Sequence, residues 1–414
     1  MSTDLTQPSR SGRRSSRQRS STRRLGRRLV AALLVGCLLG ALCLLGGGWY
    51  FAGQIRSDGL VRNQAATAYD LAVVSVSGGS STVSVGLHEA PALPPNPSLR
   101  RTAVYGLAWP TGTGVLSATS TTGPAGAVVR TLTVTAGVAP VVGAPAALRR
   151  DVFDTPTGAY GAQLQDVTIP CAGGGCPAWY LPGTGRTWAI LVHGKGASRT
   201  EPLRALGAAL KVGMPSLVIS YRNDAGAPAD PSGYYRYGST EWPDLDNAVR
   251  YAQQRGARQV VLFGFSMGGA VVASFLQHSS RSTAVTGVVL DAPMLSFRRT
   301  VDFAAAQRTL PLLGTAIPPA LTWTAQTIAG WRYGIGWDDI DYLDGHWLRV
   351  PALVFHGTDD LTVPIATSDE LRQARPQLVE LVRVDGAAHV ESWNLDPTSY
   401  TATLVAFLQR VGAV

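Results

Sequence analysis

An alternation of short apolar segments with amphipathic segments begins near Asp151 and continues to the C-terminus. This alternation predicts βαβ units and a mostly parallel sheet that is flanked by helices. We expect eight strands, at residues 163–169, 177–181, 188–192, 215–220, 259–263, 287–290, 352–355 and 379–384. We expect helices at residues 201–212, 244–254 and 267–278, among others.

The strand candidate 259–263 is followed directly by a G-x-S-x-G motif with Ser266 at its centre. A serine between a strand and a helix lies on a sharp turn, where side chains at Gly264 and Gly268 would collide with their surroundings. The start of the helix favours negative charge, so we expect the backbone N–H of Met267 to be one oxyanion donor. Taken alone, the motif is also compatible with an ordinary glycine-rich turn.

Two later residues have the chemistry and position to complete a catalytic triad. Asp360 follows the strand candidate 352–355, and His389 follows the last one. A nucleophilic serine needs a neighbouring base, and the base needs an acid that orients it. The order serine, aspartate, histidine is that of α/β-hydrolases. Asp291, after the strand candidate 287–290, is an alternative acid.

Residues 356–364 read His-Gly-Thr-Asp-Asp-Leu-Thr-Val-Pro. They resemble the H-G-x-x-D-x-x-V-P signature that carries the triad acid in many α/β-hydrolases, which favours Asp360. With the serine motif and His389, they make residues 151–414 resemble monoacylglycerol-lipase-like and prolyl-oligopeptidase-like serine hydrolases of the α/β-hydrolase superfamily. The resemblance implies an α/β-hydrolase fold and an acyl-enzyme formed on Ser266, without a cofactor or a metal.

The segment His193-Gly194-Lys195-Gly196 follows the strand candidate 188–192. In α/β-hydrolases a His-Gly segment at this place bends the backbone so that a following N–H faces the nucleophile. The resemblance assigns that second oxyanion donor to Lys195. We expect its side chain to be solvated at a cleft rim, because flexible lysines usually stay hydrated. His193 is interpreted as a structural histidine of this loop.

Residues 294–349 interrupt the alternation of strands and helices after the sixth strand candidate. They hold several helical segments and four tryptophans, at positions 323, 331, 337 and 347. α/β-Hydrolases commonly insert a cap at this point, which would exclude water and shape a pocket. The alternative is a set of ordinary helices that cover the sheet.

Residues 29–52 contain no charged residue and are long enough to span a bilayer as a helix. Residues 1–28 hold nine arginines and one acidic residue, and so account for eight of the nine net positive charges. The basic residues therefore form a tail, which we expect to be disordered, and do not indicate a nucleic-acid-binding face. By the positive-inside rule this tail is cytoplasmic and the rest of the protein lies outside the cytoplasm.

Two other interpretations of the apolar segment remain open. A cleaved signal peptide would usually have a shorter apolar core and an A-x-A-like cleavage site. Residues 34–37, Leu-Val-Gly-Cys, resemble a lipoprotein acylation box, but the apolar sequence continues well beyond Cys37. We therefore favour an uncleaved membrane anchor of the cell membrane.

The four cysteines fall into two pairs. Cys171 and Cys176 bracket Ala-Gly-Gly-Gly, and two thiols are too few for a structural zinc site. In an oxidising compartment we expect them to form a disulfide, with two free thiols as the alternative. Cys37 and Cys43 lie in the apolar segment, where we expect them to pack as small apolar side chains.

Residues 53–150 are rich in Val, Thr, Ser and Gly and contain no motif that suggests chemistry. Alternating runs predict strands at residues 71–76, 82–87, 104–109 and 128–135. We interpret the region as a small β-rich module next to the membrane. It lies outside the part of the chain that resembles a hydrolase.

The sequence predicts a serine hydrolase that cleaves a small-molecule or lipid ester. A peptidase or amidase of prolyl-oligopeptidase-like type is the first alternative, because the same triad serves both reactions. A binding protein on a hydrolase scaffold is the second, although decay of catalysis should leave a triad member missing. The sequence contains no phosphate-binding loop, dinucleotide fingerprint or zinc-type spacing.

Overall fold

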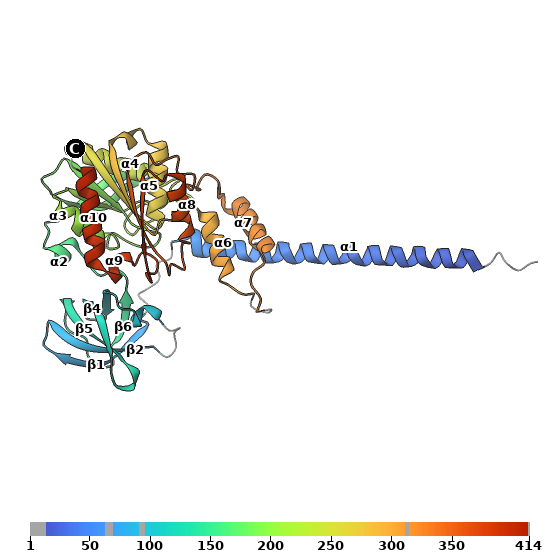
Figure 1. The fold of residues 1–414 in the computed structure, drawn as a ribbon, viewed down its shortest axis with the longest axis horizontal. Coiled ribbons are helices and arrows are strands. Elements are labelled where there is room, and N and C mark those ends of the chain that lie inside the picture. The colour runs from blue at the N-terminus through green and yellow to red at the C-terminus, as the bar shows by residue number, and fades with distance from the viewer. Residues whose placement is uncertain (1–13, 63–68, 91–95, 311–313, 413–414) are drawn as a thin grey trace, which may run out of the picture.

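The computed structural model describes residues 14–62, 69–90, 96–310 and 314–412, and for residues 14–26 it describes the backbone only. Three parts are visible in Figure 1: a long N-terminal helix, a small barrel and a larger α/β domain. The helix projects from the α/β domain, and the barrel lies to one side of that domain, away from the free end of the helix.

The α/β domain is built on one eight-stranded sheet in the order β14-β13-β12-β11-β9-β10-β8-β7. Its strands are β7 (Gln165–Cys171), β8 (Gly174–Leu181), β9 (Thr187–Val192), β10 (Ser216–Ile219), β11 (Gln259–Phe265), β12 (Val285–Asp291), β13 (Ala352–Gly357) and β14 (Val379–Val384). Each predicted strand corresponds to one of them. The hairpin β7–β8 is antiparallel, β8 pairs antiparallel with β10, and the remaining pairs are parallel.

Helices cover both faces of this sheet. On one face lie α4 (Trp242–Gln254), α5 (Met267–His278) and α8 (Ala366–Ala374), and on the other α3 (Leu203–Lys211) and α10 (Pro397–Gly412). Two short helices, α2 (Pro156–Tyr160) and α9 (Ser392–Leu395), complete the domain. In β11, Leu262 packs into one core and Phe263 into the other. Burial of both faces explains why the central strands are continuously apolar in sequence.

The region expected to be β-rich is a closed barrel in the strand order β1-β2-β5-β4-β3-β6. Its strands are β1 (Leu71–Gly78), β2 (Thr82–Glu89), β3 (Tyr105–Trp109), β4 (Gly112–Thr122), β5 (Val128–Gly137) and β6 (Pro145–Arg149). The barrel has a core of its own, in which Val85, Leu107 and Leu132 are fully buried. Closure removes the exposed strand edges that a small open sheet would present.

The N-terminal helix α1 (Arg14–Gln54) continues into a π-helical segment, η1 (Ile55–Leu60). The stretch from Arg27 to Leu60 is long and apolar enough to cross a membrane, by length and composition. The helix begins at Arg14, so the expectation of a disordered tail is wrong for residues 14–28. Residues 1–13 lie outside the described part of the chain.

The end of this helix belongs to the α/β domain, which corrects the boundary expected at residue 53. Ala52 and Leu60 are buried in the core of the α/β domain. The Tyr235 N–H donates a hydrogen bond of 2.9 Å to the Leu60 carbonyl oxygen, and the Tyr237 hydroxyl donates one of 2.8 Å to the Gly59 carbonyl oxygen. The α1–η1 segment is therefore anchored in the larger domain, and the barrel begins only at β1.

The insertion between β12 and β13 contains two longer helices, α6 (Phe297–Ala306) and α7 (Pro319–Tyr333). Both lie beside the C-terminal end of α1 (Figure 1). A Cβ atom on Gly48 would be only 2.6 Å from the side chain of Thr324, so α1 and α7 are in close contact there. Glycine permits such an approach because it has no side chain.

Candidate active site

Ser266 occupies the turn between β11 and α5 with φ +49° and ψ −118°. This conformation is strained for an L-residue and persists only where the surroundings enforce it. A Cβ atom on Gly268 would lie 2.2 Å from the Val192 carbonyl oxygen, and one on Gly264 would lie 2.7 Å from the Gly268 carbonyl oxygen. Both glycines are therefore needed to hold the serine at this turn.

The three predicted triad residues are joined by hydrogen bonds. The Nε2 atom of His389 lies 2.9 Å from the Ser266 hydroxyl oxygen, and its Nδ1 atom lies 2.7 Å from Oδ2 of Asp360. The carboxylate only accepts, so Nδ1 carries the hydrogen and Nε2 is free to accept the serine proton. Asp360 is buried, whereas Ser266 and His389 are partly exposed.

Asp360 is held as a carboxylate by several donors. Oδ1 accepts the backbone N–H groups of Thr362 and Val363, at 2.8 and 2.9 Å. Burial opposes the ionised form, but hydrogen bonds from His356 and His389 hold the pKa of Asp360 below its usual range. The acid can therefore orient His389 without becoming protonated.

His356 contacts the predicted triad acid, a contact that the sequence did not indicate. Its Nε2 atom faces Oδ2 of Asp360 at 3.2 Å and the Val363 carbonyl oxygen at 3.1 Å, so this nitrogen carries the hydrogen. Its Nδ1 atom lies 2.7 Å from the Ser368 hydroxyl. The only signal for this contact was its place four residues before Asp360 in the signature.

The alternative acid, Asp291, ends β12 and has other partners. Its carboxylate accepts hydrogen bonds from the hydroxyls of Ser392 and Tyr400, at 3.2 and 3.1 Å. Burial raises the pKa of Asp291 to about 6. The structure therefore brings Asp360, and not Asp291, to His389.

The predicted oxyanion loop lies against the serine. A Cβ atom on Gly194 would be 2.9 Å from Cβ of Ser266. The Gly194 N–H itself donates to Glu201 at 2.7 Å and is not available for a substrate. Met267 is the first residue of α5, where N–H groups have no acceptor within the helix. The roles of the Met267 and Lys195 N–H groups stay predictions.

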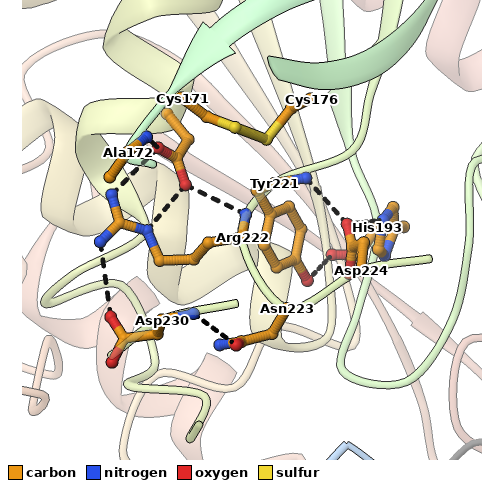
Figure 2. The surroundings of a disulfide bond; sticks show 10 residues. Cys171, Ala172, Cys176, His193, Tyr221, Arg222, Asn223, Asp224 and Asp230 are labelled. Carbon is orange, nitrogen blue, oxygen red and sulfur yellow. Dashed lines mark hydrogen bonds and ion pairs between the residues drawn. A yellow bond between two sulfur atoms is a disulfide. The ribbon is translucent and has the colours of Figure 1, made fainter. Parts of the chain in front are cut away.

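His193 is hydrogen-bonded to the Gly194 backbone of this loop and to Asp224, next to which it lies in Figure 2. Its Nε2 atom donates to Asp224 at 2.9 Å and its Nδ1 atom to the Gly194 carbonyl oxygen at 2.8 Å, while Tyr221 stacks on the ring. Both acceptors lack a hydrogen, so both ring nitrogens are donors and the ring is positively charged. Burial opposes that charge, but Asp224 outweighs it and raises the pKa of His193 to about 8.

An ion pair between the partly exposed Arg150 and the buried Glu201 joins the Gly194 loop to the His389 loop. Glu201, which accepts the Gly194 N–H, lies 3.2 Å from Nη2 of Arg150. Nη1 of Arg150 donates to the His389 carbonyl oxygen at 3.1 Å. These contacts hold His389 and the loop in one arrangement, although no motif marked Arg150 or Glu201 for this role.

The predicted disulfide between Cys171 and Cys176 is present at the tip of the β7–β8 hairpin, with Cα atoms 5.8 Å apart. The Ala172 N–H donates to Asp244 at 3.3 Å, and Nε of Arg222 donates to the same carboxylate at 2.8 Å. Figure 2 shows this cluster beside the turn that carries Tyr221 and Asp224. The disulfide thus braces the turn that supports His193.

The other two cysteines correct an expectation. Cys37 and Cys43 are free and exposed on α1, and are not packed within the protein. Within the described residues, no cluster of three or more His, Cys, Asp or Glu side chains is arranged to hold a metal ion.

The side chain of Lys195 also differs from the expectation of a solvated lysine. Its Nζ atom donates a hydrogen bond of 2.6 Å to the backbone carbonyl oxygen of Asp58, in η1. Burial lowers the pKa of Lys195. The Asp58 carboxylate in turn pairs with Arg308 at 3.1 Å. Lys195 therefore links the oxyanion loop to the end of the N-terminal helix.

A family model described as serine aminopeptidase, S33 (Hydrolase_4) matches residues 231–332. The match includes Ser266 and its flanking glycines but ends before Asp360 and His389. It covers about a quarter of the chain. No curated protein sequence is significantly similar to the chain.

Several solved structures are similar to the α/β domain. The esterase Pf2001 of Pyrococcus furiosus is 20% identical with a TM-score of 0.50, over 63% of this chain and 95% of the esterase. The esterase EaEST of Exiguobacterium antarcticum is 17% identical with a TM-score of 0.43, over 59% and 100% of the two chains. The α/β-hydrolase GrgF of a Penicillium species is 19% identical with a TM-score of 0.45, over 61% and 100%.

At such low identity, the likeness to Pf2001 bears on the fold alone. It agrees with the strand order, the serine turn and the family match described above. The chain has the α/β-hydrolase fold, preceded by a long apolar helix and a β-barrel.

Proposed function

We propose that this protein is a serine hydrolase that cleaves carboxylic esters. Ser266 attacks the carbonyl carbon, His389 takes the serine proton and returns it to the leaving alcohol, and Asp360 keeps His389 in the required tautomer. Water then releases the acyl group by the same steps. The N–H groups of Met267 and Lys195 stabilise the oxyanion, a contribution of roughly 3–4 kcal/mol per donor. The proposal rests above all on the unbroken hydrogen-bonded chain from Asp360 through His389 to Ser266.

An ester is preferred over an amide because an apolar cavity of about 330 Å³ adjoins the Lys195 turn. Such a cavity suits an acyl chain better than a charged peptide terminus. The name of the similar Pyrococcus furiosus esterase agrees with this choice. The second candidate is a serine peptidase, which the match to the serine aminopeptidase family favours.

We further propose that α1 anchors the enzyme in the cell membrane with its catalytic domain outside the cytoplasm. The arginine-rich side of an apolar helix stays in the cytoplasm by the positive-inside rule. The Cys171–Cys176 disulfide is typical of an oxidising compartment and supports the same orientation. Protection of the domain from a protease added to the cytoplasmic side of sealed vesicles tests this orientation, and digestion from that side would contradict it.

The catalytic assignment is tested on the full chain in lipid nanodiscs, because the end of α1 is part of the folded domain. We expect Ser266→Ala to lower aryl-ester turnover by about 10⁴ or more. We also expect a fluorophosphonate to label the wild type and not this variant. Ser280→Ala, a substitution at an exposed position, serves as the matched control.

The outcomes separate the candidate functions. Faster cleavage of peptide amides than of aryl esters would favour the peptidase. Unchanged ester turnover in Ser266→Ala would remove the serine from the mechanism. Absence of both labelling and turnover in the wild type would favour a non-catalytic binding protein.

A further inference from the structure

The apolar cavity near the proposed active site has an unusual wall. Part of its lining comes from α6 and α7, the helices of the insertion, through Val301, Ala304 and Ala325. Another part comes from the end of the N-terminal helix, through Phe51 and Ile55. The helix that would anchor the protein thus also forms one side of an open pocket of about 330 Å³.

The cavity does not include the triad side chains, but two segments next to the proposed catalytic groups line it. Lys195, whose N–H is the proposed oxyanion donor, lines it on one side. Leu361 and Thr362, directly after the triad acid Asp360, line it on another, and the Thr362 N–H donates to the Asp360 carboxylate at 2.8 Å. If the Lys195 N–H binds the carbonyl oxygen of an ester substrate, this cavity is the apolar space next to the acyl chain of that substrate.

The charged groups of the cavity lie together at the end of η1. Lys195 is bonded to the Asp58 carbonyl oxygen, and the Asp58 carboxylate is paired with Arg308. These groups satisfy one another, and the remaining lining is mostly Phe, Ile, Val, Ala and Leu. Such a lining favours a hydrocarbon chain and offers few partners to a peptide.

Exposed aromatic side chains surround the same end of α1. Trp49 and Tyr50 of α1 and Trp323 and Trp331 of α7 are all at least 49% exposed. The rings of Trp49 and Trp331 lie 6.4 Å apart. Tryptophan and tyrosine favour the interface between bilayer and water. On the N-terminal side of these aromatic residues, α1 exposes an apolar surface that includes Leu33, Leu38 and Leu42.

We propose that this cavity binds the acyl chain of a lipid ester drawn from the bilayer, with the end of α1 as one of its walls. The inference rests on the proposed ester hydrolysis and names its substrate class: an amphiphile with one long hydrocarbon chain. The anchor then does two things, because it places α7 at the bilayer surface and forms one wall of the pocket that Lys195 and Thr362 also line.

The first test measures chain-length selection by the full chain in nanodiscs. Each buried methylene strengthens binding roughly fourfold, so kcat/KM of the wild type should rise steeply from acetyl to decanoyl esters. Ala304→Trp fills the cavity and should lower kcat/KM for the decanoyl ester by at least about tenfold, while the acetyl ester stays within about threefold. Ala306→Trp, on the same helix at an exposed position outside the lining, is the matched control.

A second test does not depend on turnover. Ser266→Ala in nanodiscs that contain a long-chain ester with a photoreactive group at the chain end should become crosslinked on residues 51–59 of the helix end or on α6. Crosslinks confined to the lipid-facing residues 29–45 would overturn the inference, and so would an unchanged chain-length profile in a folded Ala304→Trp variant.

The two proposals fail in different ways. Crosslinking of the cavity without turnover of any ester would support the acyl site and remove the proposed function. Turnover of esters of all lengths, without selection and without cavity crosslinks, would keep the function and remove the acyl site.

Discussion

The Tyr105 hydroxyl donates a hydrogen bond of 2.8 Å to Oε2 of Glu391 and joins the barrel to the segment that carries His389. Glu391 follows His389 by two positions. Arg101, just before β3, pairs with the same carboxylate at 3.3 Å and with Asp359 at 3.4 Å. Asp359 directly precedes Asp360, the proposed triad acid. The barrel therefore contacts both loops that supply partners to Ser266.

We predict that Tyr105→Phe destabilises the protein by about 1.5–3 kcal/mol, because it removes a hydrogen bond to a charged, buried acceptor. Burial and Glu391 raise the pKa of Tyr105, so its hydroxyl remains a donor throughout the accessible pH range. The midpoint of thermal unfolding and the kcat for an ester measure the effect. Tyr69→Phe, at an exposed position, is the control, and an equal response of the two variants would contradict the prediction.

Replacement of the triad acid should be far more damaging than replacement of its neighbour. Asp360→Asn is expected to lower kcat by about 10⁴, because an amide does not hold the imidazole in the required tautomer. Asp291→Asn keeps an oxygen for the Ser392 or Tyr400 hydroxyl and should lower kcat by less than about tenfold. Steady-state kinetics on one aryl ester compares them. Reversed effects would assign the acid to Asp291.

The ion pair between His193 and Asp224 should make the stability of the folded protein depend on pH. The pKa of His193 is about 8 in the folded protein, against an ordinary value of 6.5. The folded state holds the proton more tightly, so the stabilisation is fully present below pH 6.5 and is lost as the pH rises through 8. This difference corresponds to roughly 2 kcal/mol.

Asp224→Asn removes the carboxylate that raises this pKa. We expect the wild type to exceed the variant in thermal midpoint by a larger margin near pH 6 than near pH 9, because only the wild type loses the stabilisation over that range. Asp338→Asn, where the side chain is 98% exposed, should show no such change. A margin that is constant with pH would argue against a charged His193.

The turn that carries Ser266 should not accept a side chain larger than hydrogen at Gly268. Gly268→Ala places a methyl group against the backbone of Val192, with no flexible side chain to give way, and should cost about 1–3 kcal/mol and most of the activity. Gly79→Ala, where the new Cβ meets its nearest neighbour at an ordinary 3.9 Å, should be tolerated. Thermal unfolding and fluorophosphonate labelling of both variants test the difference. Normal labelling of Gly268→Ala would refute it.

Much of the α/β domain could be predicted because its signals are local. The central strands β9 to β13 are short apolar runs that are buried on both faces, and each of the eight candidates overlaps an observed strand. Ser266, Asp360 and His389 each follow a strand that ends at the same edge of a parallel sheet. That topology brings them together without further information from the sequence.

The supporting residues were not predictable in the same way. Two of them, Glu201 and Arg150, contact partners that are distant in sequence. The third, His356, stands at a motif position to which no role was assigned. Such contacts leave no repeating pattern in a single sequence. A polar residue gives no sign of its partner until the fold brings the two together. For the same reason the Asp224 partner of His193 was not anticipated.

The sequence by itself determined the alternation of strands and helices, the serine turn, the order of the triad and the disulfide pair. These depend on backbone preferences and spacings within a few residues. Only the tertiary structure decided that the N-terminal helix forms one wall of the cavity and that Lys195 bonds to the end of this helix. It also decided that the barrel contacts the segments around Asp360 and His389. Such contacts join segments up to hundreds of residues apart, and they form only when the packed cores bring those surfaces together.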